Sequence, residues 1–159
     1  RVSVQAFFEP DTLIGKSAPT DNNNTTNDGA KAMLIVAAGC MIKGGVLDVS
    51  AGNIYLGEGV EIEPGVVVKG PAIIGKGCKL RPGAFLRGDC VLGRGAVVRC
   101  EMKNAILMDE VEVAHPGYVG DSILGYKAHF GCQSLTANLG LLGGNCIMDL
   151  PAEGGGGAE

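Results

Sequence analysis

Ile54-Tyr55-Leu56-Gly57-Glu58-Gly59 is the first of eight six-residue units that follow one another without a gap up to Glu101. The fifth and sixth positions of the unit collect glycine and proline, and the first position is small or branched in every unit. The third position is always aliphatic: Leu56, Ile62, Val68, Ile74, Leu80, Leu86, Leu92 and Val98. A repeat of this period is typical of a parallel β-helix solenoid.

The geometry of a strand explains the unit. Side chains alternate between the two faces, so the first and third positions point inward and the second points outward. A turn rich in glycine and proline then bends the chain before the next strand. Three such strands make one triangular coil of eighteen residues, and successive coils stack at about 4.8 Å, the usual spacing between strands. The sequence therefore predicts an all-β fold.

Length, composition and charge exclude several classes of protein. A chain of 159 residues suits one domain with a real core. The net charge is −4 and no basic run occurs, which argues against a nucleic-acid partner. The longest apolar run, residues 32–41, is too short to cross a bilayer, so we expect no transmembrane segment. The chain begins with Arg1, which would fit removal of a targeting segment and an organellar location, although the sequence does not define the compartment.

The six cysteines include no C-x-x-C pair. Cys78 and Cys90 fall at inward first positions, so reduced thiols in the core are expected and a disulfide framework is not. The two histidines, His115 and His129, lie fourteen positions apart and cannot supply the three histidines of the γ-class carbonic anhydrases, so no metal site is predicted.

The repeat divides the chain into three parts. Residues 1–50 form an N-terminal extension with a polar loop at 17–29 and irregular strands at 30–50, where an incomplete first coil is possible. The β-helix follows at 51–139, with about four to five coils, and a Gly-rich tail at 140–159. The repeat frame slips at 102–104, which predicts a bulge or small loop. A second frame follows, with Ile106, Glu112, Tyr118, Ile123 and His129 pointing outward.

Eighteen-residue stacking predicts which outward side chains become neighbours. Tyr55, Ile73 and Val91 fall on one face of the solenoid, where they form an exposed apolar ladder. Exposed apolar patches usually mark an interface, so we expect this face to contact a sister subunit, as in a homotrimer, or another protein. The alternative is that the N-terminal segment of the chain itself covers the ladder.

The segment after the frame slip resembles a known family. Lys103 and His115, twelve positions apart, and the motif His115-x-x-Tyr118-x-Gly120-Asp121 resemble the acetyltransferase domain of bifunctional sugar-1-phosphate nucleotidylyltransferases. The run from Val119 to His129 is most similar to the short subgroup related to glucose-1-phosphate thymidylyltransferase. The resemblance covers roughly residues 50 to 139 and implies a left-handed coil, against the usual right-handed crossover.

The resemblance also implies roles for five residues. His115 would be the general base that takes the proton from a sugar amine attacking a thioester. The phosphates and sugar of a sugar nucleotide would be held by Lys103, Tyr118 and Arg87, or Arg81 in place of Arg87. Asn138 would line the acetyl-group side.

The sequence departs from the family at several points. His129-Phe130-Gly131-Cys132-Gln133 replaces an Asn-x-Gly-Ala-Gly stretch, and Ala114 replaces the proline before the base. The later coils, which in that family bind coenzyme A, and the nucleotidyltransferase domain are not in this sequence. We therefore favour a catalytically reduced relative that acts as a binding or assembly subunit of a larger complex and uses no cofactor. The alternative is an acetyltransferase or sugar-nucleotide binder, which would use acetyl-CoA.

Overall fold

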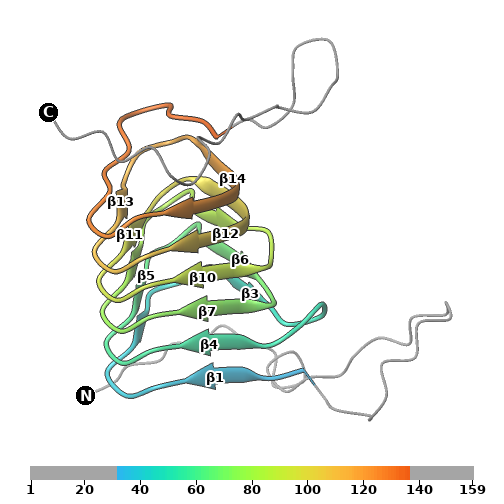
Figure 1. Ribbon diagram of the computed structural model, residues 1–159. Coiled ribbons are helices and arrows are strands. Elements are labelled where there is room, and N and C mark those ends of the chain that lie inside the picture. The colour runs from blue at the N-terminus through green and yellow to red at the C-terminus, as the bar shows by residue number, and fades with distance from the viewer. Residues whose placement is uncertain (1–31, 137–159) are drawn as a thin grey trace, which may run out of the picture.

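The computed structural model describes residues 32–136, which fold entirely into short parallel strands and turns. The strands stack as a solenoid of about five coils, as predicted. In Figure 1 the chain passes along β4, turns to β5 behind it, returns along the back and rises to β7 above β4, which is a left-handed winding. The all-β, left-handed parallel β-helix is confirmed.

The solenoid has three faces. The first face carries β1 (Leu34–Val36), β4 (Ile54–Leu56), β7 (Ala72–Ile74) and β10 (Cys90–Leu92), followed by the second halves of β12 (Glu101–Leu107) and β14 (Tyr118–Leu124). The second face carries β2 (Met41–Ile42), β5 (Glu61–Ile62), β8 (Lys79–Leu80), β11 (Val97–Val98) and β13 (Glu112–Val113). The third face carries β3 (Val46–Asp48), β6 (Val67–Lys69), β9 (Phe85–Leu86) and the first halves of β12 and β14.

The interior is the aliphatic column that the repeat predicted. Ile54 and Leu56 of the first hexad are fully buried, and so are the residues that follow them at the same positions through Val98. Because each inward side chain sits above its counterpart in the coil below, one continuous core runs along the axis. Cys78 and Cys90 are free and buried in this column, as expected for core thiols.

Strands β1, β2 and β3 form a full triad that pairs with β4, β5 and β6. They lie in residues 30–50, where the sequence indicated irregular strands and an incomplete coil. The regular hexad is lost there because Leu34 pairs with Ile54, twenty positions on, while the next two coils advance by eighteen. The loop at 17–29 and the tail at 140–159 lie outside the described residues.

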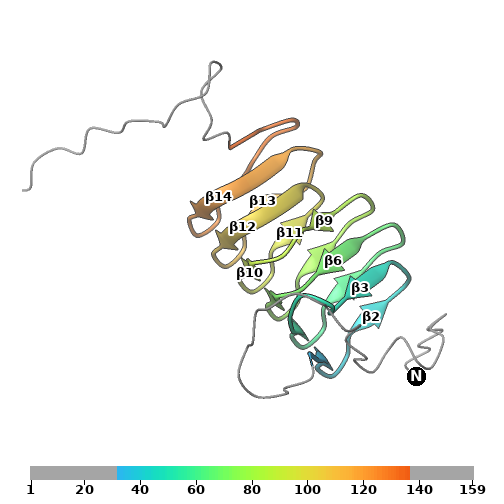
Figure 2. The ribbon, with the colours of Figure 1, turned by 90° about the vertical axis from the view of Figure 1, so that its right-hand side faces the viewer.

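The frame slip is a shortened coil, and the predicted bulge or loop at 102–104 is wrong. Cys90 pairs with Ala105, fifteen positions on, whereas Ala72 pairs with Cys90, eighteen positions on. The chain passes from the third face to the first within one seven-residue strand, β12, which is longer than the strands of earlier coils (Figure 2). Asn104 makes the bend with a φ of 47°, and Asp121 does the same in β14 with a φ of 48°. Short polar residues tolerate this left-handed conformation better than most.

No helix in residues 32–136 is long and apolar enough to span a membrane.

Candidate functional site

The third face gathers three of the residues to which the resemblance assigned a role. Leu86 pairs with Met102, so Arg87 and Lys103, one position further along, project from neighbouring coils. The Arg87 amide donates to the Met102 carbonyl at 2.8 Å, which fixes this register. Both side chains are exposed. Tyr118 lies on the next coil, where it pairs with Glu101.

Tyr118 lies against the third face because Gly120, beneath its ring, has no side chain. Gly120 pairs with Lys103, and a Cβ at Gly120 would lie 2.2 Å from the Tyr118 hydroxyl oxygen. The ring therefore lies over Gly120, which brings its hydroxyl to the strand position facing Lys103. Thr136 fixes the backbone beneath, because its hydroxyl accepts from the Gly120 amide at 2.8 Å and donates to the Gly120 carbonyl at 3.0 Å.

A carboxylate already engages one of the cations. Arg87 Nη1 donates to Glu101 Oε1 at 2.7 Å, and both side chains are about 40 % exposed, at 43 % and 41 %. In water such a pair is weak and opens readily to another anion. Lys103, in contrast, makes no ion pair with any residue of the described coils. An anionic ligand at this edge would therefore meet one available ammonium and one guanidinium shared with Glu101.

The structure does not bring His115 into this group. His115 is exposed in the turn between β13 and β14, at the opposite edge of the third face. It lies five residues before Gly120, and at full extension this stretch of chain would span roughly 16 Å. Arg81, the alternative to Arg87, also lies at that far edge, on the coil below Arg99. Asn138 is outside the described residues.

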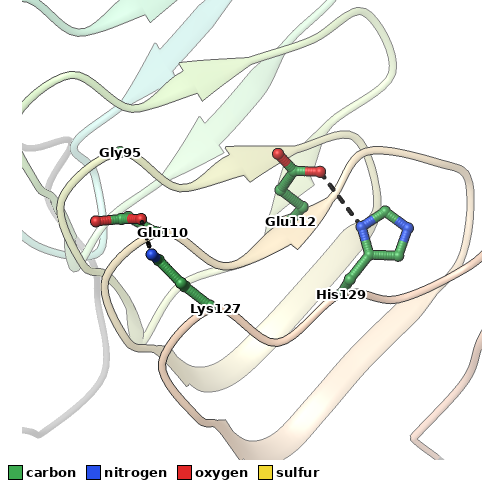
Figure 3. A pocket seen from close by; sticks show the side chains of 5 residues that line it. All are labelled: Gly95, Glu110, Glu112, Lys127 and His129. Carbon is green, nitrogen blue, oxygen red and sulfur yellow. Dashed lines mark hydrogen bonds and ion pairs between the residues drawn. The ribbon is translucent and has the colours of Figure 1, made fainter.

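The second face carries an open groove of about 380 Å³ lined by Gly95, Glu110, Glu112, Lys127 and His129 (Figure 3). Each of its two basic side chains contacts a carboxylate: Lys127 Nζ lies 3.3 Å from Glu110 Oε2, and His129 Nδ1 lies 3.3 Å from Glu112 Oε2. The Tyr126 side chain and then Glu110 raise the pKa of Lys127. Glu110 and Lys127 have positive φ, whereas the earlier turns at this corner place glycine there. Lys127 is thus paired with Glu110 and the His129 ring contacts Glu112, so neither basic side chain of the groove is available to bind an anion.

The first face is different because its outward column is entirely apolar. Tyr55, Ile73 and Val91 are exposed neighbours on successive coils, as predicted. The column extends further than the sequence indicated, since the register adds one residue below and two above. Its six members, between 36 % and 66 % exposed, are Ile35, Tyr55, Ile73, Val91, Ile106 and Ile123. We call this column the apolar ladder.

Charged pairs border the apolar ladder at the corner with the second face. Lys76 Nζ lies 2.6 Å from Glu58 Oε2, and Arg94 Nη2 lies 2.6 Å from Asp109 Oδ2. The Arg94 side chain holds the pKa of the Asp109 carboxyl below its usual value. The equivalent column of the second face contains Glu61, Lys79 and Glu112, so it is broken by charge. An apolar centre beside a polar rim is the usual anatomy of a protein interface.

Sequence reasoning named Gly120 only as part of a motif, and it missed the place of Gly120 under the Tyr118 ring, Thr136 and the extension of the ladder across the frame slip. No local pattern gives them, because each depends on which coil positions face each other after the coil shortens. No group of three or more His, Cys, Asp or Glu side chains within residues 32–136 could hold a metal ion.

Comparison with known proteins agrees with the repeat. Residues 53–88 match the family model of the bacterial transferase hexapeptide (six repeats), so this segment is a hexapeptide-repeat domain. A segment of 39 residues is similar to curated proteins named bifunctional protein GlmU. The identity is 46 % for Methanococcus maripaludis strain C7 and 49 % for Methanococcus vannielii and Methanocaldococcus jannaschii. That segment is 24 % of this chain and only 9–10 % of each relative. No solved structure matches the chain significantly.

Proposed function

We propose that this chain is a binding and assembly module that docks onto another protein subunit through the apolar ladder. The observation that carries this proposal is the uninterrupted column of six exposed apolar residues along the first face. It persists even where the coil shortens and the frame of the repeat changes. A surface selected only for solubility would be expected to place a charge on at least one of these coils, as the second face does.

The size of the apolar ladder fits a docking surface. Six side chains at these exposures present on the order of 500 Å² of apolar surface, within the range of about 300–600 Å² for the largest, often functional, patches of monomers. The ladder lies on a rigid sheet in which every strand of the middle coils is paired on both sides. Little conformational entropy is therefore lost when a partner binds. The partner is a sister subunit, as in a homotrimer, or another component of a larger assembly.

Ile73→Lys tests this proposal, because it places a charge at the middle of the apolar ladder. The matched control is Leu135→Lys, which changes an apolar residue that is 66 % exposed and belongs to the third face. Size-exclusion chromatography with light scattering reports the oligomeric state, and affinity purification from the native host reports other partners. We expect Ile73→Lys to weaken association at least about tenfold and Leu135→Lys to leave it unchanged. Unaltered oligomeric state and partners in Ile73→Lys would refute the proposal.

A second candidate function is binding of a sugar nucleotide on the third face, with acetyl transfer if a donor site exists. It is favoured by Arg87, Lys103 and Tyr118, which lie on three successive coils, with the ring of Tyr118 over Gly120, the residue that pairs with Lys103. In this function Lys103 and Arg87 would bind the phosphates. His115 would act as the base, although it lies at the other edge of the face.

Calorimetry distinguishes the two functions. The ligands are UDP-N-acetylglucosamine and acetyl-CoA, each titrated into wild-type protein and into Lys103→Ala. A control, Lys79→Ala, removes an exposed lysine from the second face. Binding of both ligands that is lost in Lys103→Ala, together with turnover that is lost in His115→Ala, would establish the second function. If neither ligand binds to wild-type protein, the second function is refuted and the assembly role remains.

A further inference from the structure

The first coil leaves the end of the core open. Its inward residues Leu34, Ile42 and Leu47 are only partly buried, and Val36 is 45 % exposed. The residues stacked directly on them in the next coil have no exposed surface at all. This bottom layer of the core consists of the same aliphatic types as the layers above it. It differs only in that no residue of the range 32–136 covers its outer side.

The same end also leaves three strand edges unpaired. β1, β2 and β3 each pair with one strand of the next coil and with no other strand in residues 32–136. An open row of backbone N–H and C=O groups beside exposed aliphatic side chains invites pairing with a further strand. Solenoid proteins generally cover such ends with a segment that differs from the repeat.

We propose that the N-terminal lead of this chain, residues 1–16, covers the open end of the first coil. The lead has the required chemistry, because Val2, Val4 and Ala6 alternate with polar residues as in a half-buried strand, and Phe7-Phe8 follows. Val2–Ala6 pairs with one of the open edges, and the two phenylalanines cover the exposed core layer. This inference is independent of the proposed assembly function.

The length of the connection allows this arrangement. Residues 17–29 are a polar, turn-rich stretch between the lead and the described part of the chain. A random-coil chain of thirteen residues has an end-to-end distance of roughly 20 Å. One face of the coil spans about six residues, or roughly 20 Å of extended chain. The lead can therefore reach any part of the open end.

A covalently attached segment has an advantage over any free partner. Its effective concentration at the open end is in the millimolar range, well above that of a second copy in solution. Moreover, the adjoining Ala32–Val36 stretch starts at the end that needs covering, so the chain does not have to cross the solenoid.

Hydrogen–deuterium exchange on the full-length chain tests the proposal. The test variant is Phe7→Asp/Phe8→Asp, and the matched control is Thr25→Asp/Thr26→Asp, which adds the same charge within the polar loop. We expect the test variant to raise the exchange rates of β1–β3 amides about 10- to 100-fold while β7–β10 stay protected, as in a local opening. The control should exchange like wild-type protein.

Three results would overturn the inference. If β1–β3 exchange equally fast in wild-type protein and in the test variant, the lead does not cover them. If their protection in wild-type protein rises with protein concentration, a second copy covers the end instead. A variant that exchanges rapidly throughout, β7–β10 included, would show that the phenylalanines act on the whole fold, which would also contradict the proposal.

Discussion

Two glycines in one turn are predicted to be required for different reasons. The turns between the first and second faces repeat the pattern Gly-x-Gly at Gly57/Gly59, Gly75/Gly77 and Gly93/Gly95. The first glycine of each pair lies against the backbone of the next coil, where a Cβ would come within 2.5–2.7 Å of backbone atoms. The second has a φ between 68° and 70°. One position is limited by space and the other by conformation.

Gly75→Ala should be the more damaging change. Its Cβ would lie 2.7 Å from the Leu92 carbonyl oxygen and 2.8 Å from the Gly93 carbonyl carbon. Both are backbone atoms, so the two coils must separate. The hydrogen bond from the Gly75 amide to the Leu92 carbonyl, now 2.8 Å long, would be weakened. A lost hydrogen bond of about 1 kcal/mol and overpacking of about 1–3 kcal/mol predict a loss of about 2–4 kcal/mol in the free energy of unfolding.

Gly77→Ala should cost less. No atom lies within 4 Å of the position of its Cβ, so only the left-handed conformation opposes the alanine. This strain is about 1 kcal/mol. Gly77→Asn is the control, because asparagine tolerates this conformation and should be less destabilising than alanine at the same site.

Urea denaturation followed by circular dichroism measures all three variants. From highest to lowest free energy of unfolding, the expected order is wild type, Gly77→Asn, Gly77→Ala and Gly75→Ala. If Gly75→Ala were as stable as Gly77→Ala, the coils would not approach each other as closely as the stacking requires. That result would refute the reasoning.

Four further outcomes follow from the core, an exposed turn and the thiols. Leu80→Ala removes a fully buried side chain of the aliphatic column and should cost about 2–5 kcal/mol in the same denaturation assay. Gln133 is exposed with a φ of 59°, so Gln133→Gly should raise the free energy of unfolding by about 0.5–1 kcal/mol, and unchanged or lower stability would contradict this. Burial raises the pKa of the Cys78 thiol to about 11 and that of Cys100 to about 12. These thiols ionise earlier in the unfolded chain, so the free energy of unfolding should fall as the pH rises from about 9 toward 12. In the native protein a thiol reagent at pH 8 should modify Cys132 and leave these two intact, which mass spectrometry of the peptides would show.

The sequence predicted the regular part of the solenoid because one local rule repeats there. The aliphatic third position of each hexad is a burial signal that needs no knowledge of distant contacts, and the column from Leu56 to Val98 is buried as a result. The neighbours Tyr55, Ile73 and Val91 followed from counting eighteen residues per coil. The left-handed winding came only from the resemblance, since nothing in a single hexad specifies it.

The sequence predicted less wherever a coil departs from eighteen residues. Ile35 and Ile106 belong to the apolar ladder, but their partners lie twenty and fifteen positions away. The bend at Asn104 had no glycine or proline to mark it, so a continuous strand was mistaken for a bulge. The same shortening decides that Gly120 faces Lys103 and that His115 falls at the far edge of the third face. These are properties of the register between coils, which becomes visible only when the coils are stacked.

The continuity of the apolar ladder across the shortened coil is the claim on which the assembly role rests most directly. Methyl nuclear Overhauser spectroscopy of the isoleucine- and valine-labelled protein measures it. Side chains on adjacent coils lie at about the 4.8 Å spacing of strands. We predict cross-peaks from Ile73 to Val91, from Val91 to Ile106 and from Ile106 to Ile123. Cross-peaks that stop at Val91, with Ile106 contacting other residues, would contradict the account.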